Sequence, residues 1–364
     1  MNQPSEVALT PPPDRSGLPP ALRTLLGLAA AVIVLAGMWL GRELIGPLAL
    51  AAVIVLICHP VRHPLERRGW PRGAATAAVI AVAYAVLVGM ALLLGYAGAE
   101  FTRMVIDYSG QLGETVAEIT ALLGSLGLES QLADAAGSIL SPGAIIGFVR
   151  SFAGSLLGVL TALFFIFAYV LFMAADGARY ARATTDFGPS AQVAVSRFQT
   201  FGTGVRRYYV VNAIFGLIVA AIDGIALWAM SIPGALVWAI LAFVTNFIPN
   251  IGFVLGLIPS MLLALVIGGW PLMVAVIVIY SVVNATLQVL VQPKFVSDAV
   301  DLSLTLSFFS VLFWTFVIGP LGAILSIPLT LLVRALILEP DPGSTWLRWL
   351  SGDSKATQSI EPAD

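Results

Sequence analysis

Eight long apolar runs constrain this chain more than any other feature of its sequence. Each run is read as helical, because backbone polar groups in lipid must be satisfied by closed hydrogen bonding. Charged residues make up only 10% of the chain, against roughly 25% in soluble domains. We therefore predict an all-α integral membrane protein. The runs cover residues 22–40, 44–58, 74–98, 152–173, 209–230, 235–268, 270–292 and 303–338.

The charges of the loops predict the orientation of these helices. Residues 59–73 contain four arginines and one acid, and residues 174–208 contain five arginines and two acids. The positive-inside rule therefore places both loops in the cytoplasm. Residues 99–151 carry six acids and two arginines, and their apolar residues recur with a helical period. This pattern predicts a small external helical region.

These signals divide the chain into five parts. The first part is rich in proline and lacks the order of a cleaved signal sequence. We expect a disordered cytoplasmic leader (1–20), N-terminal transmembrane helices (21–98), the external helical region (99–151), a transport core with its cytoplasmic loop 174–208 (152–339) and a cytoplasmic tail (340–364).

Two apolar runs are interrupted by helix-breaking residues. In residues 235–268, a break at 246–252 leaves halves that would rise only about 17 and 22 Å, short of the roughly 30 Å hydrocarbon core. The loop charges require this run to start and finish outside, and 303–338, broken at 319–322, to start and finish inside. Because each run starts and finishes on one side of the membrane, we predict two broken or re-entrant hairpins that enter from opposite faces, as in secondary transporters. Alternatively, each run could be two ordinary transmembrane helices joined by a tight turn, which would also start and finish on one side.

Asp223 is the only acid well inside an apolar run. Carboxylates are costly in lipid, and those that occur there are functional by default. Asp223 is therefore the predicted site at which a proton or monovalent cation is exchanged. The alternative is that Asp223 lies nearer the membrane interface or only hydrogen-bonds a neighbouring helix.

A polar stripe follows in the next run, where Ser281, Asn284, Gln288 and Gln292 are spaced by three, four and four residues. This spacing places them on one helix face. Amides offer donors and acceptors without charge, which suits a neutral hydroxylated solute or a hydrated ion. Hydrogen bonding between helices is the structural alternative.

The two breaks complete the predicted substrate path. Pro249 cannot donate a backbone hydrogen bond, so carbonyls about one turn upstream become available to a ligand, to water or to the side chains of Asn246 and Asn250. Gly252 and Gly256 have the spacing that lets another helix approach closely. The predicted path consists of Asn246, Pro249, Asn250, Gly252, Ser281, Asn284, Gln288, Gln292, Gly319, Pro320 and Gly322.

Other classes of function find no support in the sequence. There is no Walker loop, Gly-x-Ser-x-Gly elbow or His-Glu-x-x-His motif, so we expect neither an enzyme nor catalytic residues nor a cofactor. Prolines interrupt the helix that would align His59 and His63, so no metal site is expected. The basic residues form no single patch, which argues against nucleic-acid binding.

Short motifs with Pro, Gly, Asn and aromatic residues recur along the chain, most densely over residues 205–335. They are Pro60, Pro64 and 66–69, Ile232-Pro233-Gly234-Ala235-Leu236, Asn246-Phe247-Ile248-Pro249-Asn250-Ile251-Gly252, Ile258-Pro259, Gln292-Pro293-Lys294, Phe313-Trp314, Gly319-Pro320-Leu321-Gly322-Ala323 and Ile327-Pro328-Leu329. Together these motifs resemble the autoinducer-2 exporter (AI-2E) family of bacterial inner-membrane permeases. The sequence departs from the family pattern at Ser297 and Leu304.

The resemblance implies a multi-pass protein of the bacterial inner membrane, with cytoplasmic termini, that forms homo-oligomers. It also implies export of a small polar solute such as an autoinducer-2-like molecule. Combined with Asp223, this predicts a secondary exporter with alternating access, coupled to a proton or monovalent cation. Some family members resemble sodium/proton antiporters, which is the nearest alternative. A non-transporting scaffold that binds partners through residues 99–151 is the alternative of another class.

Overall fold

All regular structure in the described part of the protein is helical. The computed structural model describes residues 19–108, 110–111, 113–115, 117, 147, 163–176, 187–249, 251–292, 302–339 and 345–352. Strands are absent from these ranges, so the predicted all-α class is confirmed. Most of the predicted external region, together with Asn250, lies outside the described residues.

Most described helices follow the predicted apolar runs. The helix Pro189–Ala229 is an exception, because it begins inside residues 174–208, which the sequence predicts to be a loop. Five of them are long and apolar enough to cross a membrane. The longer helices are α1 (Pro20–Leu40), α2 (Arg42–Cys58), α4 (Arg72–Asp107), the helix Leu163–Asp176, α9 (Pro189–Ala229), α10 (Ala235–Thr245), α11 (Gly252–Asn284), α13 (Leu304–Ile318) and α14 (Pro320–Val333). The shorter elements are η1 (His59–Val61), α3 (Arg62–Arg67), η2 (Ala285–Val291), η3 (Arg334–Leu338) and α15 (Thr345–Ser351).

The first predicted break is present between α10 and α11. The chain turns there through a hydrogen bond from the Ile248 N–H to the Thr245 carbonyl at 2.9 Å. Gly252 then starts α11 so close to Thr245 that a Cβ atom on Gly252 would overlap the Thr245 carbonyl. α11 is itself interrupted at Gly269, where φ is 68° and ψ is −165°. The segment 235–268 is therefore a broken hairpin with the predicted ends.

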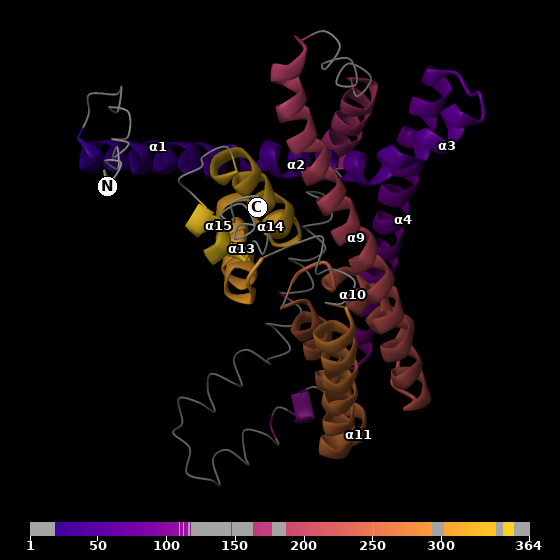
Figure 1. The fold of residues 1–364 in the computed structure, drawn as a ribbon. Helices are drawn as coiled ribbons and strands as arrows, with labels where there is room; N and C mark the ends of the chain where they lie inside the picture. The colour runs from indigo at the N-terminus through magenta and orange to yellow at the C-terminus, as the bar shows by residue number, and fades with distance from the viewer. Residues whose placement is uncertain are drawn as a thin grey trace, which may run out of the picture.

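The second predicted break joins α13 to α14. Gly319 has φ 77° and ψ −160°, a conformation that glycine adopts without steric cost. Pro320 follows as the first residue of α14, where its missing N–H would have no helical partner in any case. The two helices lie side by side as a tight hairpin (Figure 1).

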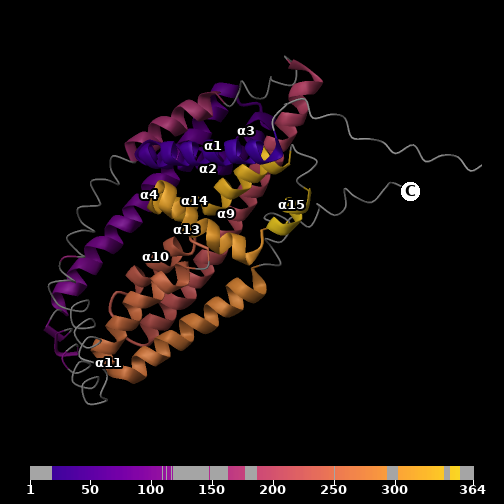
Figure 2. The same cartoon turned by 90° about the vertical axis from the view of Figure 1, so that its left-hand side faces the viewer.

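The long helix α9 is the central element of the fold. It packs against α2, α10, α11 and α14. In Figure 1, α2 crosses its upper part, whereas α11 lies beside its lower part. Figure 2, turned by 90°, shows α13 and α14 between these two levels. The centre of α9 is thus enclosed by the two broken hairpins and α2.

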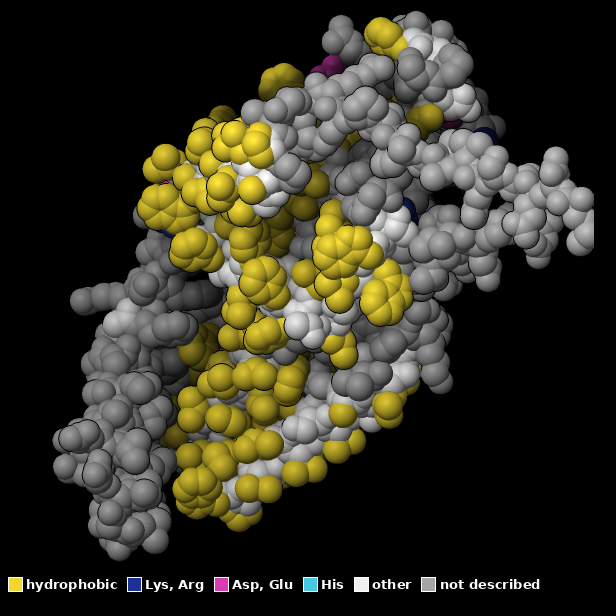
Figure 3. Space-filling view, turned by 60° about the vertical axis from the view of Figure 1, so that its left-hand side comes forward, with side chains coloured by type: hydrophobic (Ala, Val, Ile, Leu, Met, Phe, Trp, Pro, Cys, Tyr) yellow, Lys and Arg dark blue, Asp and Glu magenta, His cyan; other side chains and the backbone are white. Residues whose placement is uncertain are grey.

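Large apolar side chains lie both inside the bundle and on its outer surface. Leu227 and Trp238 are buried where α9 meets α10. By contrast, Ile33, Trp228 and Phe316 are each more than 70% exposed, and Figure 3 shows apolar side chains gathered over one face. Apolar surface of this extent suits hydrocarbon rather than water. The fold is that of a multi-pass membrane protein.

Candidate functional site

Two glycines bring α9 close to α10 where both helices carry polar residues. A Cβ atom at Gly216 would lie 2.7 Å from Asn246 Nδ2, and one at Gly224 would lie 2.9 Å from the Ala239 Cβ. Both distances are shorter than ordinary van der Waals contact. The missing side chains therefore allow Asn246, which follows the end of α10, to reach the backbone of α9.

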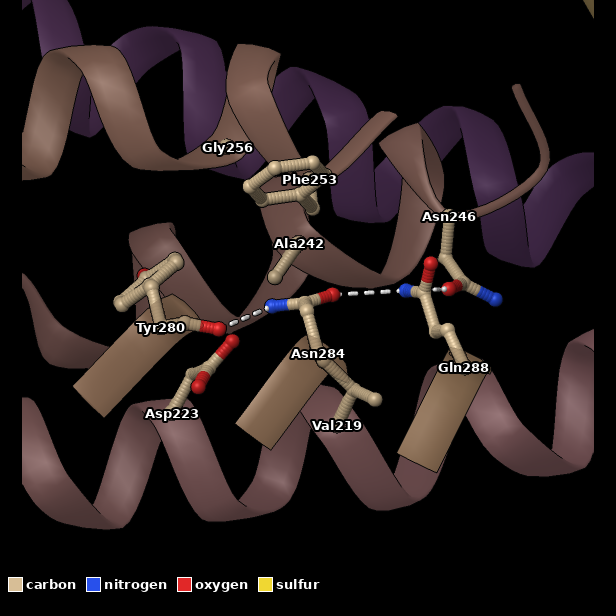
Figure 4. A pocket seen from close by; sticks show the side chains of 9 residues that line it. All are labelled: Val219, Asp223, Ala242, Asn246, Phe253, Gly256, Tyr280, Asn284 and Gln288. Carbon is tan, nitrogen blue, oxygen red and sulfur yellow. Dashed lines mark hydrogen bonds between the residues drawn. The ribbon is translucent and has the colours of Figure 1, made fainter. Parts of the chain in front are cut away.

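Asn246, Gln288 and Asn284 form a chain of hydrogen-bonded amide side chains, the amide relay, with Gln288 in the middle (Figure 4). Asn246 Oδ1 accepts a hydrogen bond from Gln288 Nε2 at 2.7 Å, and Asn246 Nδ2 donates to the Asn212 carbonyl at 2.9 Å. Gln288 Nε2 also donates to Asn284 Oδ1 at 2.7 Å. Asn284 Nδ2 donates to the Tyr280 carbonyl at 2.8 Å. The amide relay thus connects α9, the first break and the end of α11.

Asp223 lies on α9 beside the amide relay and is completely buried, with 0% of its surface exposed. Neither carboxylate oxygen has a hydrogen-bond partner among the described residues. The Tyr280 hydroxyl is also buried and unpartnered there, and Figure 4 shows the two residues next to each other. An unpaired buried carboxylate is costly when it is charged. A proton or a cation at Asp223 would remove this cost.

Asp223 and the amide relay line one small cavity. Its free space is about that of one water molecule. A proton, a water molecule or one small cation fits this space, whereas a larger solute requires the helices to separate. The lining residues are Val219, Asp223, Ala242, Asn246, Phe253, Gly256, Tyr280, Asn284 and Gln288.

The family relationship agrees with this arrangement of broken hairpins around a polar centre. Residues 28–339 match the model of the AI-2E family transporters. The chain belongs to the AI-2E transporter family. The matched range includes both broken hairpins and all residues that line the Asp223 cavity.

Bacterial relatives align with this AI-2E protein over nearly their whole length. A presumed transport protein of Haemophilus influenzae is 28% identical over 336 residues, which are 91% of this chain and 96% of that protein. The AI-2 transport protein TqsA of Escherichia coli is 27% identical over 335 residues, with the same coverage. The presumed transport protein YhhT of Escherichia coli is 26% identical over 347 residues, covering 95% and 97%. This AI-2E protein is therefore a membrane transport protein.

Four of the predicted site residues meet in the AI-2E fold. Asp223, Asn246, Asn284 and Gln288 line the same cavity although they come from three separate parts of the chain. Asp223 makes no hydrogen bond to a described residue, so the alternative of a purely helix-bonding acid is not supported. The predicted roles of these residues in transport stay predictions.

Ser281 does not lie on the inward helix face that the predicted stripe requires. It is exposed on the outside of α11, whereas Tyr280, one residue earlier, is buried against Asp223 and lines the cavity. Tyr280 precedes Asn284 by four residues, whereas Ser281 precedes it by three. A spacing of four residues returns closer to the same helix face than a spacing of three does. The inward stripe therefore begins at Tyr280 and not at Ser281.

The glycines and prolines of the predicted path have structural positions. Gly252 packs against the Thr245 backbone, and Gly322 packs equally closely against the Trp314 carbonyl. Pro249 is half-buried in the first turn, whereas Pro320 is exposed at the second. These residues, with Gly319, do not line the cavity at Asp223. They shape the two breaks, as the close-packing interpretation of Gly252 predicted.

A change from α-helix to π-helix sets the position of Gln292. The chain continues from α11 into the π-helix η2, and the Gln292 N–H donates to the Leu287 carbonyl at 2.7 Å. The Gln292 side chain donates to Asn212 Oδ1 and so extends the amide relay back to α9. π-Helical turns are rare and frequent at functional sites. The regular α-helical spacing used for the prediction contains no signal for this turn.

Sequence reasoning did not identify Asn212 as a site residue. It is 3% exposed and links Asn246, through its carbonyl, to Gln292, through its side-chain oxygen. Its signal was an amide inside the apolar run 209–230, the same criterion that identified Asp223. Tyr280 was missed because tyrosine is also common as an apolar core residue.

Replacing Asn246 by alanine is expected to lower the free energy of unfolding by about 1–3 kcal/mol, because buried hydrogen-bonding groups lose their partners. The Gln288 amide loses one acceptor, and the Asn212 carbonyl loses one donor. Thermal unfolding of the purified protein in detergent measures the change. Ser281→Ala is the matched control on the exposed side of α11, with an expected effect within about 0.5 kcal/mol. Equal stability of both variants would contradict a structural contribution of the amide relay.

Proposed function

We propose that this protein is a secondary transporter that exports a small polar solute and couples its movement to a proton or monovalent cation at Asp223. One observation carries the proposal. Asp223 is completely buried beside the amide relay, without a hydrogen-bond partner among the described residues. Binding of a proton or cation changes the charge at this position and so favours one conformation over another.

The amide relay supports a polar, uncharged solute. Its side chains both donate and accept hydrogen bonds, and hydroxyl groups of a solute can replace the bonds that Asn246, Asn284 and Gln288 make with one another. Because the bond between Gln288 and Asn246 joins η2 to the first break, replacing it would let these two segments move apart. Alternating access then consists of breaking the amide relay on one side and reforming it after release.

The relative TqsA is named as an AI-2 transport protein. By that relationship, an autoinducer-2-like signalling molecule is the solute that we propose for this chain. A small hydroxylated molecule fits the uncharged donors and acceptors of the amide relay. Export as the direction of transport is part of the same proposal.

Sodium/proton antiport is the second candidate, and the size of the cavity favours it. The free space beside Asp223 is about that of one water molecule. A monovalent cation without its hydration shell fits such a space without separation of the helices. The Asp223 carboxylate would then bind the cation and the proton alternately.

Liposomes containing the purified protein and a pH-sensitive dye test both candidates. A pH gradient is imposed, and sodium or a neutral hydroxylated solute is added to one side. The exporter predicts that the solute dissipates the gradient and that sodium does not, whereas the antiporter predicts the reverse. Liposomes without protein give the background leak. A sodium gradient with labelled solute tests coupling of export to a monovalent cation. Absence of coupled flux under both the pH gradient and the sodium gradient, from folded protein, would contradict both candidates.

We also place the protein in the bacterial inner membrane with both termini in the cytoplasm. The arginine-rich loops 59–73 and 174–208 support this orientation through the positive-inside rule. Reporter domains that are active only in the periplasm or only in the cytoplasm, fused after residue 364, test it. Activity of the periplasmic reporter would reverse the assignment.

A further inference from the structure

A second small cavity shares no lining residue with the one at Asp223. It lies where α2, η1, α3, α4 and the helix Leu163–Asp176 meet. Its wall is largely apolar, and Arg62 is the one lining residue that carries a permanent charge. The lining residues are Val55, His59, Arg62, Thr76, Val79, Met173 and Ala174.

Arg62 is only 9% exposed, although it is a charged residue. Its Nε donates to Glu66 Oε1 at 2.6 Å. A guanidinium group has five N–H donors, and those of the two Nη groups have no acceptor among the described residues. Buried charged groups are normally fully hydrogen-bonded. The Nη groups of Arg62 therefore have unused capacity for an anionic acceptor.

The charges around Arg62 add to a positive excess. Glu66 is its one acidic partner, and Arg72 also acts on that acid. Arg206 from α9 lies within electrostatic reach of the same loop. Asp176 is exposed and has a partner of its own. An anion that entered the cavity would thus contact Arg62 and also experience the positive charges of Arg72 and Arg206, against which Glu66 provides one negative charge.

We propose that the Arg62 cavity binds the phosphate group of an anionic phospholipid. Guanidinium groups bind phosphate oxygens through two parallel N–H donors, and basic pockets between transmembrane helices are suited to lipid headgroups. The His59 ring, which lines the same cavity, offers a further N–H. A bound headgroup would join α3 to α4 and to the helix Leu163–Asp176, which meet at this cavity.

The surroundings of the cavity favour a lipid over free phosphate. Phe172, next to the lining residue Met173, is 65% exposed, and Leu171 is 44% exposed. These side chains continue the apolar outer surface of the helix directly beside the charged cavity. A phospholipid matches both the charged cavity and the apolar surface beside it, because its phosphate reaches Arg62 while its acyl chains cover the apolar side chains. Inorganic phosphate would satisfy only the first.

The test measures binding to the full-length protein in detergent, with phosphatidylglycerol, phosphatidylcholine and inorganic phosphate as separate probes. Native mass spectrometry counts bound lipid, and thermal unfolding reports stabilisation. Phosphatidylglycerol is expected to bind and stabilise, and the other two probes are not. Arg62→Gln should weaken phosphatidylglycerol binding by about tenfold or more, the loss expected for a charge-assisted hydrogen bond. Arg68→Gln, at an exposed arginine of the same loop, is the matched control and should bind like the unaltered protein.

Two results would overturn the proposal. One is equal phosphatidylglycerol binding by Arg62→Gln and Arg68→Gln. The other is equal protection by inorganic phosphate, which would identify a free anion as the ligand. If Arg62→Gln does not fold, Arg206→Gln replaces it, with an expected loss of about fivefold for one basic residue near the headgroup. Unchanged binding by Arg206→Gln would then count against the site.

Discussion

Asp223→Asn is expected to reduce gradient-driven flux at least about tenfold, because it removes the one fully buried acid among the described residues, at which a proton or cation can exchange. The side chain keeps nearly the same shape, so α9 and α10 should pack as before. A neutral amide also avoids the cost of a buried unpaired charge. The thermal midpoint of the variant is therefore expected to equal or exceed that of the unaltered protein.

Initial rates in the liposome assay, with a pH gradient, measure this effect. Asp107→Asn is the matched control. Asp107 is exposed at the end of α4, so this variant should leave the flux unchanged. Downhill movement of solute without a gradient separates coupling from passage, and it is expected to persist in Asp223→Asn. Gradient-driven flux that is the same in both variants would exclude Asp223 as the coupling site.

Gly252→Ala should destabilise the protein by about 1–3 kcal/mol or more, the range for overpacking a closely packed site. The added Cβ would overlap the Thr245 carbonyl, and a backbone group of the turn cannot rotate away as a side chain can. The break between α10 and α11 would have to open, and Asn246 would move from the amide relay. We expect a lower thermal midpoint and a loss of coupled flux.

Gly89→Ala on α4 provides the control, because a Cβ atom at Gly89 would have no neighbour within 4 Å. Alanine inside a helix is favoured over glycine by roughly 0.5–1 kcal/mol, so this variant should be as stable as the unaltered protein or slightly more so. Fluorescence-detected size exclusion and thermal unfolding in detergent compare the two. If Gly252→Ala matched Gly89→Ala, the tight approach at the first break would not be required.

The helices and their breaks could be predicted because their causes are local. A long apolar run must be helical in lipid wherever it packs, and most of the described helices fall on the predicted runs. The first half of α9, from Pro189, is more polar and was predicted to be a loop. The break at 246–252 was predicted from Asn, Pro and Gly, and the second at 319–322 from Gly and Pro. The steric reason for Gly252 and Gly322, an adjacent backbone carbonyl, was not visible in the sequence.

The candidate site could be predicted only as separate parts. Asp223, Asn246 and the amides near 284–292 were each identified as polar groups in apolar surroundings, a criterion that needs no partner. The same criterion should have identified Asn212. It could not distinguish Tyr280 from Ser281, because both lie within reach of the predicted face and a helix wheel does not say which neighbour is packed against it.

Hydropathy and backbone chemistry along short segments are enough to predict the membrane class, most of the helices and the positions of the two breaks, although not the start of α9 at Pro189. That Asp223 and the amide relay share one cavity is visible only in the three-dimensional arrangement of the helices. That result depends on the close approach of α9 and α10 at Gly216 and Gly224, and on the π-helical turn of η2. Contacts between distant segments arise from packing, which no local pattern encodes.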